Sequence, residues 1–427
     1  MCHPGEVTDQ SPTPLGRVVP RHASQLVADA LTDTRVVLVA GARQCGKSTL
    51  VHQLAKGERV EWRNLDRPTA LEAAHSDPTG FVAFPDLMVI DEIQRAPELL
   101  LAIKEQVDSH PTPGQYLLTG SARVLGLRSL PDTLPGRMET IELWPFSQGE
   151  IEGRRDSFVD AVFADGDKLG HTSSVTRNDY VERVTRGGFP EAVARTNPRR
   201  RERFFDSYTT DLITRDVSRL SEIERTGEMQ TLLRLVAARS GQLLVERPLS
   251  NDTGLSASTV GRYMSLLEEV FLIKRIPAWS RNLSNRATAT PKVAFVDSGV
   301  AANLLGADAR SLVRPGGAFG PLLEGFVLME LARQLTWSDE RADLYHYRTK
   351  DKVEVDAILE SRRGQVAGIE VKAASTVRSE DFAGLRHLAE RLGDDFLAGI
   401  VLHTGPETLS FGHRLRAMPV SALWEIS

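Results

Sequence analysis

The sequence is poor in cysteine and has no long hydrophobic run. Its two cysteines, Cys2 and Cys45, are too few for a disulfide framework or a structural zinc site. No stretch approaches the ~18 consecutive apolar residues that a membrane-spanning helix requires. We therefore expect a protein that neither crosses a membrane nor depends on disulfides.

The chain also lacks a strong excess of charge of one sign. Its formal net charge is −5, with 41% hydrophobic and 26% charged residues, which is typical of soluble globular proteins. Bulk electrostatics therefore do not favour a nucleic-acid partner, and any DNA binding must use local basic patches. The N-terminal stretch is polar and proline-rich and has no apolar signal core, so we expect a disordered tail over residues 1–19 and a cytoplasmic protein.

The length predicts roughly two to four domains. Between residues 20 and 146, short apolar runs alternate with helical patterns, which predicts an α/β domain with a parallel sheet covered by helices on both faces. Residues 147–230 are rich in Arg and Glu at helical spacing and predict a helical lid. Residues 231–290 predict a small helical module, and residues 291–427 predict a second α/β domain.

A glycine-rich segment follows the first buried strand and fits the phosphate-loop pattern G-x-x-x-x-G-K-[ST]. It consists of Gly41, Ala42, Arg43, Gln44, Cys45, Gly46, Lys47, Ser48 and Thr49. In such a loop, backbone N–H groups turn toward phosphate oxygens, and the helix that follows adds a favourable dipole. We expect Lys47 to reach the β- and γ-phosphates of ATP and the Ser48 hydroxyl to bind Mg²⁺.

Polar side chains end the strands that follow. Asp91 and Glu92 close an apolar run, where Asp91 would hold Mg²⁺ through water and Glu92 would polarise the attacking water. Thr119 and Ser121 end the next run; they either touch the γ-phosphate or the water, or cap the strand in the ordinary way. Arg137 lies in a later loop and is either a surface residue or a catalytic arginine, acting in cis or across a subunit interface. Homo-oligomerisation stays open.

The segment 247–279 has the outline of a helix-turn-helix followed by a basic strand. Gly254 would end the first helix, and Ser256 would cap the second. The second helix would present four side chains to DNA, namely Ser258, Thr259, Arg262 and Tyr263. The alternative is a protein-docking or regulatory module of the same shape.

Near the C-terminus, two segments that alternate with period two flank a turn centred on Arg363. A hairpin with this centre pairs Asp356 with Glu370, and directly opposed like charges are destabilising. A divalent cation held by both carboxylates would offset the repulsion, and such oxygens suit Mg²⁺ or Mn²⁺. Lys372 could then activate water. The alternative is an ordinary half-exposed hairpin in which Lys372 alone neutralises the pair.

These residues, preceded by Glu324 in a predicted helix, resemble the core of PD-(D/E)XK nucleases. The resemblance implies Mg²⁺-dependent hydrolysis of phosphodiesters, with catalytic roles for Glu324, Asp356, Glu370 and Lys372. A proline often precedes the aspartate in that core, whereas Val355 stands there in this sequence.

The whole chain from about residue 20 resembles a family of bacterial and archaeal AAA-type ATPases. The resemblance rests on four segments in this order: GARQCGKST, LMVIDEIQRAPELL, QYLLTGSARVL and RGGFPEAV. The resemblance implies that the phosphate loop, Asp91 and Glu92 bind and hydrolyse the nucleotide. It also implies a winged helix in the middle of the chain and a nuclease-like fold at its end, within a C-terminal half that is classed as a domain of unknown function. The segment Gly187–Glu191 is either a hinge or a contact that responds to nucleotide.

Three functions are compatible with these features. In the first, ATP hydrolysis moves the lid and the winged helix and licenses a Mg²⁺-dependent DNA endonuclease. In the second, ATP toggles a regulatory switch, and in the third it drives remodelling of proteins; in both, the C-terminal domain is catalytically inert. We expect ATP and Mg²⁺ as ligands and DNA as the further partner.

Overall fold

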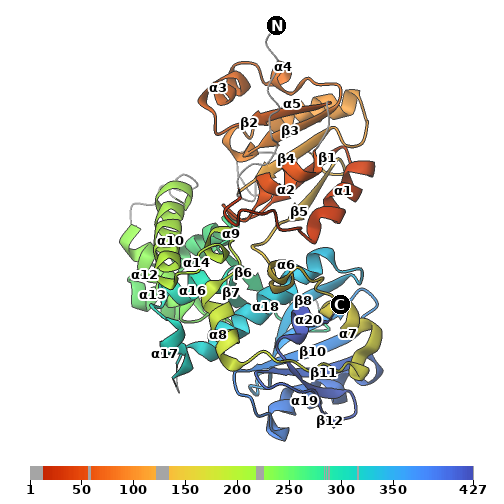
Figure 1. Cartoon of the computed structure of the whole chain (residues 1–427), viewed down its shortest axis with the longest axis vertical. Helices are drawn as coiled ribbons and strands as arrows, with labels where there is room; N and C mark the ends of the chain where they lie inside the picture. The colour runs from red at the N-terminus through yellow and green to blue at the C-terminus, as the bar shows by residue number, and fades with distance from the viewer. Residues whose placement is uncertain are drawn as a thin grey trace.

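The computed structural model describes residues 13–55, 59–121, 134–217, 226–282, 284, 286, 289–314 and 317–426. Figure 1 shows three units: an upper one coloured red to orange, a mainly green helical one below it on the left, and a blue one at the lower right. Within the described residues, no helix combines the length and the apolar character needed to cross a membrane.

The upper unit contains a five-stranded parallel sheet in the order β2-β3-β4-β1-β5. All residues of β1 and β4 are buried, as expected for central strands covered on both faces. The predicted α/β fold of the P-loop type is confirmed. The elements are α1 (Ala23–Asp33), β1 (Val36–Ala40), α2 (Lys47–Leu54), β2 (Val60–Asn64), α3 (Pro68–Ser76), α4 (Pro78–Val82), β3 (Leu87–Asp91), α5 (Leu99–Ser109), β4 (Tyr116–Gly120) and β5 (Met138–Glu142).

The middle of the chain is mostly helical. The segment predicted as one lid contributes to two units, because α7 packs on the C-terminal unit whereas α8 and α10 pack against α16. The elements are α6 (Gln148–Glu152), α7 (Phe158–Asp165), α8 (Arg177–Arg186), α9 (Pro190–Val193), α10 (Pro198–Asp211), the π-helix η4 (Leu212–Val217), α12 (Thr226–Ala237), α13 (Glu246–Thr253), α14 (Ala257–Glu269), β6 (Ile273–Ile276), β7 (Lys292–Phe295), α16 (Ser298–Leu304) and α17 (Ala309–Val313).

The C-terminal unit contains a six-stranded mixed sheet in the order β12-β13-β11-β10-β9-β8. Helix α19 packs on this sheet against β9, β10 and β11, while α18 contacts β8 and β10 and also reaches β7. The elements are α18 (Phe319–Trp337), β8 (Ala342–Arg348), β9 (Glu354–Ser361), β10 (Val366–Lys372), α19 (Ala383–Leu392), β11 (Phe396–His403), β12 (Leu409–Gly412), β13 (Leu415–Pro419) and α20 (Ala422–Glu425).

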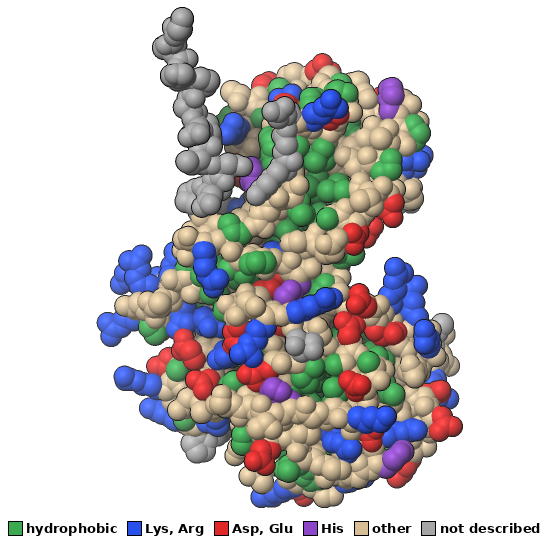
Figure 2. All heavy atoms as spheres, turned by 45° about the vertical axis from the view of Figure 1, so that its right-hand side comes forward, with side chains coloured by type: hydrophobic (Ala, Val, Ile, Leu, Met, Phe, Trp, Pro, Cys, Tyr) green, Lys and Arg blue, Asp and Glu red, His purple; other side chains and the backbone are tan. Residues whose placement is uncertain are grey.

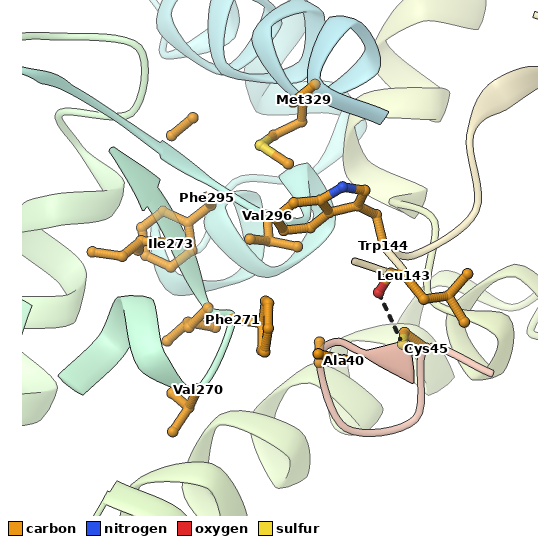
Figure 3. Close-up of a cluster of buried hydrophobic side chains, with 14 of the residues drawn as sticks. Ala40, Cys45, Leu143, Trp144, Val270, Phe271, Ile273, Phe295, Val296 and Met329 are labelled. Carbon is orange, nitrogen blue, oxygen red and sulfur yellow. Dashed lines mark hydrogen bonds between the residues drawn. The ribbon is translucent and has the colours of Figure 1, made fainter. Parts of the chain in front are cut away.

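One hydrophobic core joins the three units. Figure 3 shows Cys45 of the phosphate loop beside Leu143, and Trp144 extending toward the middle and C-terminal elements. The rings of Trp144 and Phe271 meet edge to face with centroids 6.0 Å apart, and Met329 of α18 lies in the same cluster. The phosphate loop is therefore packed through apolar side chains onto the elements that carry the rest of the molecule.

Candidate functional site

The phosphate loop has the backbone geometry that its glycines permit. Gly46 has a φ of 103°, a conformation that residues with a side chain rarely adopt. A Cβ on Gly41 would lie 2.1 Å from the carbonyl oxygen of Leu143, so only glycine fits there. Behind the loop, the Cys45 thiol is fully buried and donates to the same carbonyl at 3.3 Å, as Figure 3 shows. Cys45 therefore supports the loop from the protein side.

Lys47 and Ser48 begin α2 at the inner end of this loop. The Lys47 ammonium is buried and donates to the carbonyl oxygens of Gly41 at 3.0 Å and Ala42 at 2.9 Å. The Ser48 hydroxyl lies 3.0 and 3.1 Å from the two carboxylate oxygens of Asp91. Among the described residues, the acceptors of this lysine are neutral, so it can exchange them for phosphate oxygens. The hydroxyl and the carboxylate meet where a Mg²⁺ ion could be held.

Polar strand ends complete this arrangement. The Thr119 hydroxyl donates to Asp91 at 2.5 Å and accepts the backbone N–H of Glu92 at 3.0 Å. The Ser121 hydroxyl donates to the Glu92 carboxylate at 3.0 Å, and the Gln94 amide also contacts that carboxylate. Thr119 and Ser121 are both buried and hold the two acidic side chains in place.

A cavity of about 270 Å³ lies beside the phosphate loop. It is lined by the phosphate loop and α2, by Glu92, by Phe146 after β5, and by Pro190 and Glu191 of the segment after α8. Part of the segment predicted as a disordered tail also lines it, whereas residues 1–12 lie outside the described residues. The lining residues from the N-terminal segment are Thr13, Pro14, Leu15, Arg17 and Val19.

Arg21 braces the cavity, and sequence reasoning missed it. Its guanidinium is buried and donates to the backbone carbonyls of Cys45 at 2.9 Å and Trp144 at 2.6 Å. It also pairs with the buried carboxylate of Glu150 at 3.0 Å. The arginine therefore ties the phosphate loop to the segment after β5. Its position before α1 offered no motif, and only the fold brings the partners together.

The segment Gly187–Glu191 lies between the cavity and β7. Gly188 accepts the N–H of Phe146 at 2.9 Å and donates its own N–H to the carboxylate of Asp297 at 2.6 Å. Asp297 is almost fully buried, and burial raises the pKa of its carboxyl against the opposing effect of its N–H donors and of Arg333. This segment therefore contacts the cavity on one side and the end of β7 on the other.

Arg137 lies away from the nucleotide site of its own chain, so the structure does not support the predicted role in cis, while the surface role and the role across a subunit interface stay predictions. Arg137 precedes β5, and Met138 pairs with Val36 at the start of β1, whereas the phosphate loop follows the other end of β1. Its guanidinium instead pairs with Asp108 at 2.5 and 3.1 Å, and this hydrogen bond lowers the pKa of that carboxyl. In a parallel sheet, a loop that enters a strand lies at the edge opposite to the loops that leave strands.

The predicted hairpin register is confirmed. Strands β9 and β10 pair antiparallel with Val366 opposite Glu360 and Ile369 opposite Ala357, so the turn is centred on Arg363. The paired residues end at Ile369 and Ala357, so Asp356 and Glu370 are the next residues of the two strands beyond the last pair. Asp356 accepts the backbone N–H of Val371 at 2.9 Å.

The four side chains predicted for a second site converge around this hairpin. Glu324 of α18 and Asp356 of β9 contact the same ammonium, while Lys372 pairs with Glu370 at 3.0 Å. Burial raises the pKa of Glu324 to about 8 and that of Glu370 to about 7, and the charge of Asp356 adds to both shifts.

A lysine that sequence reasoning missed lies between two of these carboxylates. The Lys292 ammonium lies 2.5 Å from Glu324 Oε1 and 2.8 Å from Asp356 Oδ1, and only 5% of its side chain is exposed. Burial lowers the pKa of Lys292, but the two carboxylates together raise it by more. The net pKa lies above the ordinary lysine value, so Lys292 stays charged. Lys292 is the first residue of β7 and is followed by the apolar residues Val293, Ala294 and Phe295. A single charged residue at the start of a buried strand was the sequence signal that could have pointed to this lysine.

The two sites differ in how well a metal ion fits. At the phosphate loop, Ser48 and Asp91 bring a hydroxyl and a carboxylate together with neutral partners around them. At the C-terminal cluster, Lys292 already occupies the space between Glu324 and Asp356. Among the residues that the structure describes, no group of three or more acidic, histidine or cysteine side chains is arranged to hold a metal ion. A divalent cation at the predicted position between Asp356 and Glu370 would have to share Asp356 with the Lys292 ammonium.

The predicted helix-turn-helix region has two helices followed by paired strands. Helices α13 and α14 contact each other, and β6 pairs antiparallel with β7. Ser258 and Arg262 are exposed on α14, but Tyr263 is buried with 2% exposure. The prediction of Tyr263 on a DNA-facing surface is wrong, because Tyr263 lies next to Met264 on the face of α14 that packs into the core.

Comparison with protein families assigns the parts of the chain. Residues 33–152 match a family described as an AAA domain. Residues 177–311 match a domain of unknown function, DUF8612, and residues 319–423 match another, DUF4143. The sheet order and the phosphate loop agree with the similarity of residues 33–152 to an AAA domain, and two regions similar to domains of unknown function follow.

Two proteins of similar sequence are themselves uncharacterized. An uncharacterized protein of Mycobacterium tuberculosis is 27% identical over 358 residues, which is 83% of this chain and 74% of that protein. An uncharacterized protein of Haemophilus influenzae is 24% identical over 223 residues, covering 51% of each.

Solved structures are similar at a lower level. RuvB of Thermotoga maritima aligns over 60% of this chain and 87% of its own, with 18% identity and a TM-score of 0.29. DnaA of Aquifex aeolicus, solved with AMPPCP, aligns over 60% and 91%, with 13% identity and a TM-score of 0.32. Scores this low carry no argument, so the ATPase assignment depends on the family match and the site.

Proposed function

We propose that this protein is a magnesium-dependent ATPase whose hydrolytic cycle acts on the C-terminal unit. One observation carries the proposal: Lys47, Ser48 and Glu92 face a cavity that is also lined by Pro190 and Glu191. The groups that would bind and cleave ATP therefore share a wall with a segment that contacts the rest of the molecule.

Each group has a role that follows from its position. Lys47 would leave the carbonyl oxygens of Gly41 and Ala42 and donate to the β- and γ-phosphates. Ser48 and Asp91 would hold Mg²⁺, which supplies charge neutralisation at the phosphate oxygens. Glu92, fixed by hydroxyl and amide donors, would orient the attacking water and accept its proton.

Two routes could carry the nucleotide state toward the C-terminal unit. In the first, Gly188 binds Asp297 directly after β7, so displacement of Glu191 by nucleotide would pull on that strand. In the second, Gln148 donates its N–H to Glu330 of α18 at 3.1 Å, and Arg333 joins Glu330 at 2.7 Å. Both routes consist of buried hydrogen bonds. Coupling between distant sites can pass through such a network when it has two discrete arrangements.

The test is Mg²⁺-ATP turnover by the full chain and by Glu92→Gln. The variant should lose about 10²–10³-fold in turnover while still binding ATP, since only proton acceptance is removed. Glu105→Gln, on the exposed side of α5, is the matched control and should behave as wild type. Folded wild-type protein that binds no ATP in the presence of Mg²⁺ would remove the proposal.

Cleavage of DNA phosphodiesters at the C-terminal cluster is a second function. It is supported by the convergence of Glu324, Asp356, Glu370 and Lys372 from a helix and a hairpin. The helix pair and paired strands of the middle unit would supply DNA contacts. Figure 2 shows Lys and Arg interspersed with Asp and Glu over the lower part of one face, so binding would depend on local contacts.

This second function is tested by incubating DNA with the full chain, Mg²⁺ and ATP. Asp356→Asn should abolish cleavage, whereas Asp351→Asn, in the exposed turn before β9, should not. Binding of DNA should weaken steeply with salt if phosphate contacts dominate. ATP turnover without cleavage of any DNA form would leave the regulatory switch or the protein remodeller as the function.

A further inference from the structure

The backbone of Lys292 belongs to the middle unit, but its ammonium lies in the C-terminal carboxylate cluster. Its strand β7 pairs with β6, with Ile276 opposite Lys292, and Leu243 forms a further bridge to Lys292. The flanking backbone is fixed as well, since Leu244 donates to Pro291 at 2.8 Å. Lys292 lies in the matched region 177–311, whereas the carboxylates that it contacts lie in the region 319–423.

The lysine occupies one oxygen atom in each of two carboxylates of the cluster. Its ammonium contacts Glu324 Oε1 and Asp356 Oδ1, while the other oxygen of Asp356 accepts the Val371 N–H. Glu370 uses one oxygen for Lys372, and its second oxygen is buried with no hydrogen-bond partner among the described residues. A metal ion bound by Glu324 and Asp356 would compete with the Lys292 ammonium for both carboxylates, and one bound by Asp356 and Glu370 would compete with it for Asp356.

The charge balance points the same way. Three carboxylates gathered in a buried place repel one another, and a buried charge needs a partner. Lys292 and Lys372 supply two positive charges at 2.5 to 3.0 Å from those carboxylates. Two of the three carboxylate charges are therefore neutralised as folded without any added cation.

We propose that Lys292 is a tethered cation, supplied by the middle unit, that fills the metal position of the C-terminal carboxylate cluster and excludes divalent metal from it. The proposal rests on the second proposed function only in treating these carboxylates as a cation site. The cluster would open to a metal only when β7 withdraws the lysine.

The experiment is a titration of the nucleotide-free full chain with Mn²⁺, followed by the electron paramagnetic resonance signal of free Mn²⁺. We expect wild type to bind no Mn²⁺ that depends on Asp356. Lys292→Met should gain one site per chain, and adding Asp356→Asn to it should remove that site. Lys292→Arg keeps the charge and should resemble wild type. Lys372→Met, which removes the other lysine, should gain no comparable site.

A second measurement covers the case in which Lys292→Met folds poorly. The melting temperature of Lys292→Met should rise with Mn²⁺, whereas that of wild type should not. Lys292→Met combined with Glu324→Gln removes one positive and one negative charge and should restore folding without Mn²⁺.

Two results would overturn the proposal. In one, wild type binds Mn²⁺ through Asp356 as tightly as Lys292→Met does. In the other, folded Lys292→Met binds no Mn²⁺. Neither readout depends on DNA cleavage, so a failure of the nuclease function alone would appear as Mn²⁺ binding by Lys292→Met without cleavage.

Discussion

The phosphate-loop site and the C-terminal cluster both combine lysine with carboxylates, but they arrange them in opposite ways. Lys47 rests on neutral backbone carbonyls, and the partners found around Asp91 are hydroxyls and an amide. Lys292, by contrast, sits directly on Glu324 and Asp356. At the phosphate loop, the lysine and the carboxylates are not paired with each other, so both can bind Mg²⁺-ATP. At the C-terminal cluster, the lysine and the carboxylates already form ion pairs.

The difference shows that a set of residue types does not by itself define a metal site. In both places the sequence offers acidic residues with a nearby lysine, as in Asp91 with Lys47 and Asp356 with Lys372. What decides the chemistry is which charge has a partner in the fold. Carboxylates held by neutral donors keep their affinity for a cation, while carboxylates paired with a buried ammonium have lost most of it.

The largest effect should come from removing the lysine of the open site. Lys47→Ala should reduce ATP turnover at least about a hundredfold, because one fixed positive charge on the phosphates is lost. Nucleotide binding by calorimetry should weaken as well. Lys104→Ala on α5 is the matched control and should leave both unchanged. If Lys47→Ala turned over ATP at the wild-type rate, Lys47 would not act on the phosphates, and the contrast between the two sites would fail.

An intermediate effect should come from the residue that joins the two regions. Asp297→Asn keeps the volume but weakens the hydrogen bond from Gly188, and we expect a loss of about 1–2 kcal/mol in unfolding free energy. Hydrogen exchange of β7 should differ between the ATP-bound and free states in wild type, and this difference should disappear in the variant. Asp308→Asn makes the same change at an exposed N-cap, where the amide oxygen can still accept the Ser311 N–H, so it should keep the difference. Loss of the difference in both variants would show that the effect is not specific to Asp297.

The smallest effect concerns pH. Burial raises the pKa of Glu330 to about 7, with Asp156 and Glu150 adding to the shift and Arg333 opposing it. A raised pKa means that the folded chain holds this proton more tightly than the unfolded chain does, so its stabilisation is complete below the ordinary carboxyl pKa and is lost as pH rises through about 7.

Between pH 5 and pH 8, the melting temperature of wild type should therefore fall further than that of Glu330→Gln, by about 2–4 °C. The exposed variant Glu105→Gln should follow wild type. Equal slopes for wild type and Glu330→Gln would show that the ion pair with Arg333 keeps Glu330 ionised throughout.

Features that depend on local pattern could be predicted from the sequence. The phosphate loop, the two carboxylates after β3 and the register of the β9–β10 hairpin each follow from residues close together in the chain, because turn geometry and strand period fix them. Two departures from the prediction are also local. Arg137 lies at the end of β5 that faces away from the phosphate loop of its own chain, and Tyr263 lies on the buried face of its helix.

Features that depend on long-range packing could not be predicted. Arg21 and Glu150 form an ion pair although 129 positions separate them in the sequence, and 64 positions separate Lys292 from Asp356. Pro190 and Glu191 reach the nucleotide cavity only because the middle unit folds back on the ATPase domain. A single sequence does not state which distant charges will be buried together, and those pairs decide which site can take a cation.

The central claim is that Ser48 and Asp91, and not the C-terminal carboxylates, form the site that is ready for a metal ion. The direct test is Mn²⁺ binding by the full chain in the presence of a non-hydrolysable ATP analogue, compared between Asp91→Asn and Asp356→Asn. We predict that the Mn²⁺ ion bound together with the analogue is lost in Asp91→Asn and kept in Asp356→Asn. An ion that persists in Asp91→Asn and disappears in Asp356→Asn would contradict the claim.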